Sequence, residues 1–166
     1  MVMLYKYDES VDDILNPLLA SVHSRLEDVT IATRLVYNQD DILPMIEKGQ
    51  RILAKTRIMN MRLRAFGMPM VTIEIEGIFW NGASKEIRVA LMDRELCHLG
   101  TPGEDKADRI VVPSIDYDYI LTGFYDVIGR HGKHAIEAIE MAKCQEYLGP
   151  LFDQMTISDF LSQDAE

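Results

Sequence analysis

The chain has 166 residues, of which 48% are hydrophobic, and its formal net charge is −10. This length suits one globular domain with its own core. The charge argues against direct binding to nucleic acid, which depends on neutralising phosphates, and no apolar run is long enough to span a membrane. With two cysteines and no export signal, we expect free thiols and a cytoplasmic protein.

The first predicted element is a helix over residues 8–27. Apolar side chains recur there at helical spacing, and Asp8 or Ser10 can cap the start. Pro17 falls inside the segment, so the pattern predicts a kink or a break. His23 follows Val22 in this helix, and we expect it at the surface or at the boundary of the core.

Strands are predicted next, where β-branched and alternating residues replace the helical spacing. The clearest segment is 70–79, MVTIEIEGIF, which alternates apolar and polar residues up to Glu76. Trp80-Asn81-Gly82 then predicts a turn. The other segments with strand patterns are 29–37, 51–60 and 109–113.

A helix over about 84–99 follows, with Asn81 or Ser84 as its cap and Gly100 placed to stop it. Residues 116–130 and 133–147 also have helical patterns.

The predicted fold class is therefore α+β: a small mixed sheet with the 84–99 helix packed on it and further helices at both ends. We expect a single domain over 1–148 and an acidic C-terminal tail over 149–166.

The helix ends in a near-motif, Arg94-Glu95-Leu96-Cys97-His98. In H-E-x-x-H, two histidines four residues apart share one helical face and bind zinc, while the glutamate acts as the base. Arg94 stands at the first ligand position, and an arginine has no lone pair to offer. Glu95 keeps the base position and His98 the second ligand position.

The context of this motif resembles the phage metallopeptidase family, a zincin-like group. The resemblance rests on VTIEIEGIFWNGASKEIRVALMDRELCHL at 71–99, with weaker similarity in RILAKTR at 51–57 and FYDVIGRHG at 124–132. It covers roughly residues 10–133. It implies a zincin-like fold in which Glu95 is the general base and His98 a zinc ligand.

The resemblance also implies a third ligand five residues before Phe124, where this chain has Tyr119. Two of three expected ligands, at Arg94 and Tyr119, are then missing. We therefore expect an inactive metallopeptidase-like protein of phage or prophage origin that holds no metal or cofactor and acts by binding a host or phage protein. Inhibition of host defence or of DNA processing is one such role.

Two alternatives remain open. One is an active zinc metallopeptidase with Glu95 as base, His98 as one ligand and others drawn from His131, His134 or Asp118. His131 and His134 form an H-x-x-H pair, whose nearest acid is Glu137. The second alternative is a structural or assembly component of a virion.

An acidic, tyrosine-rich stretch, IDYDYILTGFYD at 115–126, supplies the candidate partner-binding residues. Tyrosine is a frequent interface anchor, and the acids suit a basic partner, such as a nucleic-acid-binding host protein. The candidates are Asp116, Tyr117, Asp118, Tyr119, Tyr125 and Asp126. Arg94 is expected to pair with Glu95 or with an acid of this stretch.

Overall fold

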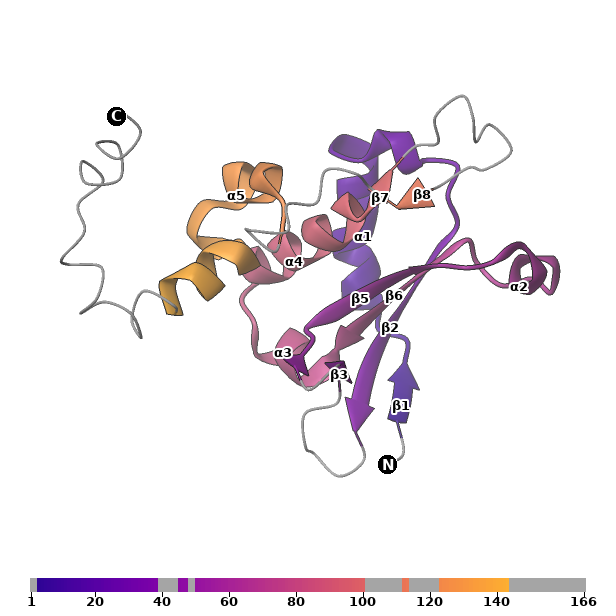
Figure 1. The fold of residues 1–166 in the computed structure, drawn as a ribbon, viewed down its shortest axis with the longest axis horizontal. Helices are drawn as coiled ribbons and strands as arrows, with labels where there is room; N and C mark the ends of the chain where they lie inside the picture. The colour runs from indigo at the N-terminus through magenta and orange to yellow at the C-terminus, as the bar shows by residue number, and fades with distance from the viewer. Residues whose placement is uncertain (1–2, 39–44, 48–49, 101–111, 114–122, 144–166) are drawn as a thin grey trace, which may run out of the picture.

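The centre of the molecule is a four-stranded mixed sheet. This computed structural model describes residues 3–38, 45–47, 50–100, 112–113 and 123–143. The strand order is β1-β2-β6-β5, in which β2 and β6 run parallel and the two outer pairs are antiparallel (Figure 1). The strands are β1 Met3–Lys6, β2 Ile31–Asn38, β5 Ala54–Ile58 and β6 Val71–Glu76.

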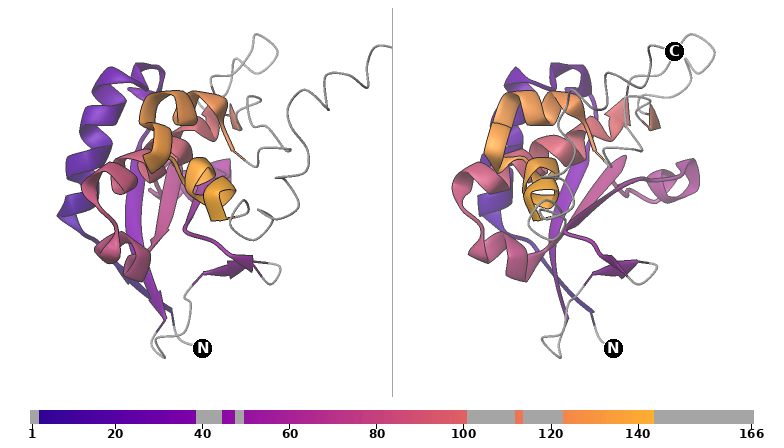
Figure 2. Two further views of the ribbon diagram at one scale, coloured as in Figure 1. Left: turned by 90° about the vertical axis from the view of Figure 1, so that its left-hand side faces the viewer. Right: turned by 60° about the vertical axis from the view of Figure 1, so that its left-hand side comes forward.

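Helices cover one face of this sheet, and the views in Figure 2 place α1 and α4 on the same side of it. The fifth helix, α5, packs against α4. The helices are α1 Glu9–Ser21, α2 Met61–Ala65, α3 Gly77–Gly82, α4 Lys85–Cys97 and α5 Tyr125–His131, and residues 136–143 are also helical. The predicted α+β class with a mixed sheet is confirmed.

Short elements complete the described structure. Two 3-10 turns follow α1 and α5, and two small antiparallel ladders lie outside the main sheet. The turns are η1 Ser24–Leu26 and η3 Gly132–His134, and the ladder strands are β3 Ile46–Glu47, β4 Gln50–Arg51, β7 Leu99–Gly100 and β8 Val112–Pro113. No helix among the described residues is both long and apolar enough to cross a membrane.

The N-terminal helix begins where its sequence predicts. Asp8 caps α1, since its side chain accepts a hydrogen bond from the Ser10 backbone N–H at 2.9 Å. The helix continues through Pro17 to Ser21, so the predicted break does not occur. Its buried face packs towards α4 and the sheet.

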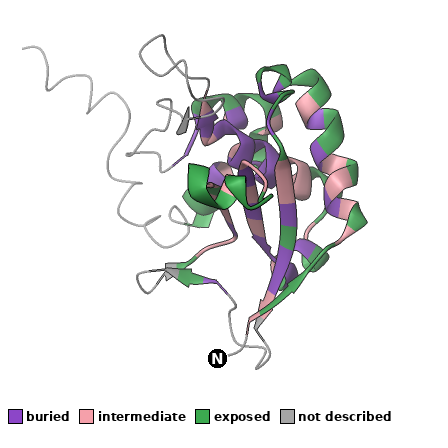
Figure 3. Ribbon diagram, turned by 90° about the vertical axis from the view of Figure 1, so that its right-hand side faces the viewer, coloured by how far each residue is buried: buried purple, intermediate pink, exposed green. Residues whose placement is uncertain are grey.

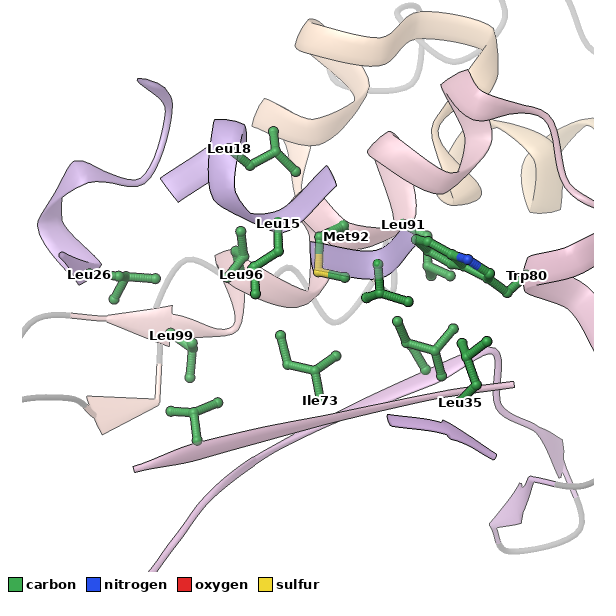
Figure 4. Packing of buried hydrophobic residues seen from close by; sticks show 14 of the residues in the cluster. Leu15, Leu18, Leu26, Leu35, Ile73, Trp80, Leu91, Met92, Leu96 and Leu99 are labelled. Carbon is green, nitrogen blue, oxygen red and sulfur yellow. The ribbon is translucent and has the colours of Figure 1, made fainter. Parts of the chain in front are cut away.

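The core lies between the sheet and the helices, as Figure 4 shows. The alternation in β6 buries every second side chain, at Val71, Ile73 and Ile75. Leu91 and Leu96 of α4 meet them from the helical side. This packing of α4 on the sheet fixes the orientation of the near-motif at its last turn.

The Trp80-Asn81-Gly82 segment is part of helix α3, so the predicted turn is wrong. Trp80 is fully buried, and its indole N–H donates to the Ser10 hydroxyl at 3.2 Å. Gly77, at the start of α3, lies against the Tyr37 ring, where a methyl group would overlap the ring. Burial of Trp80, which the local pattern does not show, explains why the chain coils here.

Several other predicted segments differ from the structure or lie outside it. Strand β1 and helix α2 were not predicted. Elements β5, β6 and α4 fall within their predicted ranges, whereas β2 extends one residue beyond its predicted end, to Asn38. Residues 114–122 and the acidic tail from 149 onward lie outside the described residues.

Candidate functional site

The near-motif occupies the C-terminal turn of α4. Ser84 caps the helix, as predicted, by accepting from the Ile87 backbone N–H at 3.4 Å. The helix ends at Cys97, and His98 is its C-terminal cap residue. Arg94, Glu95 and His98 therefore stand on one ordered turn that the core holds in place.

Arg94 forms an ion pair with Glu137, a residue of the 136–143 helical segment. The Arg94 Nε lies 3.2 Å from the Glu137 Oε1, and the exposed fractions of the two side chains are 17% and 0%. Glu137 Oε1 also accepts a hydrogen bond from the Phe124 backbone N–H at 3.3 Å. A guanidinium thus stands at the first ligand position with a buried carboxylate facing it, and Asp116 and Asp118, two of the acids predicted to pair with Arg94, lie outside the described residues.

Glu95 is buried beside the sheet. Its Oε2 accepts a hydrogen bond from the Thr56 hydroxyl of β5 at 2.8 Å. Burial raises the pKa of this carboxyl, the Arg94 cation opposes that rise, and the Glu137 charge adds to it. Glu95 therefore sits in a low-dielectric position, next to a cation, where a general base would stand.

His98 completes the turn. Burial, reinforced by the nearby Arg94 cation, lowers its pKa from 6.5 to about 4. The ring packs edge-on against Phe124, with centroids 4.9 Å apart and an interplanar angle of 79°. The imidazole is therefore neutral at pH 7.

The described residues do not fit a zinc ion held by the i, i+4 pair. Of that pair only His98 has a lone pair, because arginine stays protonated and offers donors alone. The Arg94 cation also pairs with Glu137 at this end of the helix. Tyr119, the other departure from the ligand pattern, lies outside the described residues.

A second polar cluster surrounds Asp93, immediately before the motif. Its carboxylate is fully buried, and four nitrogen contacts reach it from three side chains. These are His23 Nε2 at 2.6 Å, His131 Nε2 at 2.7 Å, and Arg130 Nε and Nη2 at 2.7 and 3.0 Å. The Arg130 and histidine contacts hold the pKa of Asp93 well below its usual range, against the effect of burial.

The hydrogen bonds of His23 define its tautomer. Arg25 Nη1 lies 2.8 Å from His23 Nδ1, and a guanidinium can only donate. Nδ1 therefore accepts, and Nε2 carries the proton donated to Asp93. The prediction that His23 lies at the surface or at the boundary of the core is wrong, since its exposed fraction is 1%. This network connects the segment after α1 to α4 and α5.

His23, Asp93 and Cys97 place a nitrogen, an oxygen and a sulfur within 4.8 Å of one another, a spacing that could suit a metal. Arg130 Nη2, however, lies 3.3 Å from the Cys97 sulfur and 3.0 Å from Asp93. A cation thus already occupies the side that a metal would use. Burial and the Asp93 charge raise the pKa of Cys97 to about 11, so it stays a thiol. We interpret the Asp93 cluster as structural.

The alternative H-x-x-H site would join His131, His134 and Glu137, but His131 and Glu137 contact different partners. His131 contacts Asp93, whereas Glu137, the acid expected to complete that site, pairs with Arg94. Neither Asp93 nor the Arg94–Glu137 pair was identified from the sequence, because both depend on contacts between residues more than 35 positions apart.

The candidate partner-binding stretch is described only in part. Tyr125 is 66% exposed, and the Asp126 side chain is 88% exposed, both on the first turn of α5. The remaining candidates, Asp116, Tyr117, Asp118 and Tyr119, lie outside the described residues.

Comparison with known proteins supports the family suggested by the motif. A family model described as "Putative phage metallopeptidase" matches residues 3–146. No curated protein and no solved structure showed significant similarity. The matched range contains the sheet, the motif helix, the Asp93 cluster and the Arg94–Glu137 pair, and the chain therefore belongs to the phage metallopeptidase family.

Proposed function

We propose that this chain is a metallopeptidase-like phage protein that does not hydrolyse peptides and acts by binding another protein. The observation that carries the proposal is the Arg94–Glu137 ion pair, whose atoms lie 3.2 Å apart at the first ligand position. A cleft built around a dication is stable only if positive charge remains there, because Glu95 and Glu137 are both buried acids. The Arg94 guanidinium supplies part of that charge permanently.

The proposed partner is a protein with a basic face. The net charge of −10 favours such a partner and disfavours direct contact with nucleic acid. Tyr125 and Asp126, exposed side by side on α5, are the described members of the proposed contact surface. A basic, nucleic-acid-binding host protein has the complementary chemistry, and blocking such a protein would give an inhibitor of host defence or of DNA processing.

The test is zinc content and peptide hydrolysis, measured on tag-free protein. We expect elemental analysis to find well under one zinc per chain, casein to remain intact, and a chelator to leave the thermal midpoint unchanged. Stoichiometric zinc with chelator-sensitive stability would overturn the proposal, since a tightly bound ligand must stabilise the native state.

A matched variant shows whether the Arg94 side chain is what excludes the metal. Arg94→His would put an imidazole four residues before His98, with Glu137 as a third donor already facing that position. We expect this variant to take up zinc in titration calorimetry. The control, Arg94→His combined with Glu137→Gln, should bind much more weakly. If Arg94→His takes up no zinc, Arg94 is not what keeps the metal out.

An active zinc metallopeptidase remains the alternative, and the neutral state of His98 favours it. An imidazole whose pKa lies near 4 is free of competing protons at pH 7, as a metal ligand must be. In that case Glu95 acts as the base and His98 as one ligand. The zinc measurement on the unmodified chain separates the two functions.

A further inference from the structure

Residues 50–70 form a basic segment in an acidic protein. They contain five arginines and lysines and no aspartate or glutamate, whereas the whole chain carries −10. The remainder of the chain therefore carries −15. Two of these cations, Arg51 and Arg57, pair with Glu76 and Glu74 of β6. Arg62 and Arg64 make no ion pair with any residue that the structure describes.

The end of this segment, residues 60–68, is an ordered projection, which we name the arm tip. Asn60 caps α2 by accepting from the Leu63 backbone N–H at 3.0 Å. The chain then turns back through Gly67, whose φ of 82° suits glycine. Backbone hydrogen bonds from Phe66, Gly67 and Met68 close the turn. Figure 1 shows α2 projecting beyond the ends of β5 and β6.

The arm tip exposes large apolar side chains from this ordered backbone, and Figure 3 shows it turned towards solvent. The exposed fractions are 76% for Met61, 41% for Leu63, 82% for Phe66 and 46% for Met68. Large apolar side chains exposed together on one short ordered segment are typical of an interaction site. Methionine, arginine and aromatic residues are the types enriched at the centres of protein interfaces, where lysine and acids are depleted.

A complementary surface exists on the same chain, which we name the N-terminal face. Tyr5 and Tyr7 are exposed there by 56% and 61%. Beside them lie the acids of the first turns of α1, Glu9, Asp12 and Asp13. The Tyr7 hydroxyl donates to Asp12 at 2.8 Å, so aromatic and acidic groups form one surface. This face offers apolar contacts and negative charge, as the arm tip requires.

The two surfaces lie too far apart to meet within one copy. β1 and β5 are the opposite edges of the sheet. β1 also pairs with the C-terminal half of β2, from Leu35 to Asn38. The chain returns from the arm tip into β6 at Val71, which pairs with Ile31 at the start of β2. At about 3.3 Å per residue, the five residue steps of β2 from Ile31 to Val36, the partner of Tyr5, separate Tyr5 from the base of the arm tip by roughly 16 Å. Asp12 lies nearer, because it accepts a hydrogen bond from Thr33, but α2 projects away from the sheet (Figure 1).

We propose that the arm tip of one copy docks on the N-terminal face of a second copy. A contact between two different surfaces is head-to-tail, so in a pair one copy keeps an unused arm tip and the other an unused N-terminal face, and association continues as a ring or an open chain. A nucleic acid or an anionic membrane would also attract Arg62 and Arg64. The −15 carried by the rest of the chain disfavours both, while a second copy supplies acids and aromatic groups together.

The experiment is analytical ultracentrifugation of the full chain over a range of concentrations, at about 0.02 M and about 0.5 M NaCl. We expect concentration-dependent association that weakens at high salt. Arg62→Glu with Arg64→Glu should be monomeric, and so should Glu9→Lys with Asp13→Lys. Lys85→Glu with Lys133→Glu is the control for the Arg62 and Arg64 variant, since it makes the same change in net charge at two exposed positions elsewhere.

Mixing the two defective variants is the decisive measurement. Each keeps one intact surface, and the two reversed surfaces are complementary in charge to each other, so the mixture should restore the association that each variant lacks alone. The neutral change Phe66→Ser should weaken wild-type association without altering its charge. The proposal is overturned if the wild-type chain stays monomeric at low salt, if the Arg62 and Arg64 variant associates as the wild type does, or if the mixture forms no complex.

Discussion

At the scale of single residues, the position of Arg94 changes what its neighbours can do. Glu95 and Glu137 are buried acids close to one cation. Replacing that cation with a neutral side chain would leave an uncompensated buried carboxylate, which costs about 3–5 kcal/mol when burial is complete. Because the Arg94 side chain is 17% exposed, we expect its replacement to reduce the unfolding free energy by an amount near the lower end of that range. The arginine therefore stabilises a site whose acids would otherwise be costly to bury.

His98 should make stability depend on pH. Its pKa is lowered to about 4 in the folded chain, from 6.5 when unfolded, so between these values the unfolded chain binds the extra proton. Stability from this residue is complete above about pH 6.5 and is lost as the pH falls towards 4. His98→Gln should abolish this dependence. After allowance for partial solvent contact, the change amounts to about 1–2 kcal/mol.

The measurement is urea unfolding of the wild type and His98→Gln at several values between pH 7 and pH 4.5. Their difference in unfolding free energy isolates His98, because other groups, including Glu95 with its raised pKa, remain in both. A difference that stays constant across this range would show that the ring is protonated equally in the folded and unfolded chains.

At the scale of elements, Asp93 determines how the helices meet. One buried carboxylate on α4 receives hydrogen bonds from His23, just before η1, and from Arg130 and His131 at the end of α5. Each donor comes from a segment that the local sequence pattern treats separately. Helix α4 and its cap were predictable, because spacing and capping are local signals. The Asp93 cluster was not predictable, because the local sequence does not distinguish a buried aspartate from an exposed one.

The contact between Glu137 and the turn before α5 can be tested at Gly123. A methyl group on this glycine would overlap the Glu137 side chain. Gly123→Ala should therefore displace Glu137 from Arg94 and reduce the unfolding free energy by about 1–3 kcal/mol, the usual cost of overpacking.

Gly129 provides the matched control. It lies within α5, and a methyl group there would meet no atom within 4 Å. Gly129→Ala should raise the unfolding free energy by roughly 0.5–1 kcal/mol, since alanine loses less conformational freedom in a helix. Thermal and urea unfolding would check both. Equal effects of the two variants would mean that the Glu137 contact adds nothing to stability.

At the scale of the whole molecule, the sheet and its covering helices followed from periodicity, while the unpredicted parts depend on distant contacts. β6 alternates because it is buried on one face, and that pattern is visible in 71–76. β1 carries one exposed tyrosine, Tyr5, and no alternation of apolar residues, so only its pairing with β2 identifies it as a strand. The segment around Trp80 forms a helix, and the Trp80 indole contacts Ser10, 70 positions away in the sequence.

Because of the net charge, added salt should stabilise the folded monomer, whereas it should weaken the association between copies. At −10 the chain repels itself, and screening by salt relieves this repulsion. Raising NaCl from about 0.02 M to about 0.5 M should therefore raise the thermal midpoint of dilute protein by a few degrees. The same change should weaken contacts between the arm tip and the N-terminal face.

Two charge variants separate these effects. Arg62→Glu with Arg64→Glu and Lys85→Glu with Lys133→Glu each replace two cations with acids, so both carry −14 in place of −10. Their thermal midpoints at low protein concentration should rise with NaCl more steeply than that of the wild type, and by similar amounts, because the cause is total charge. Only the first should lose association at high concentration. A midpoint that falls with salt would instead show that surface ion pairs outweigh the repulsion, because screening weakens those pairs as well.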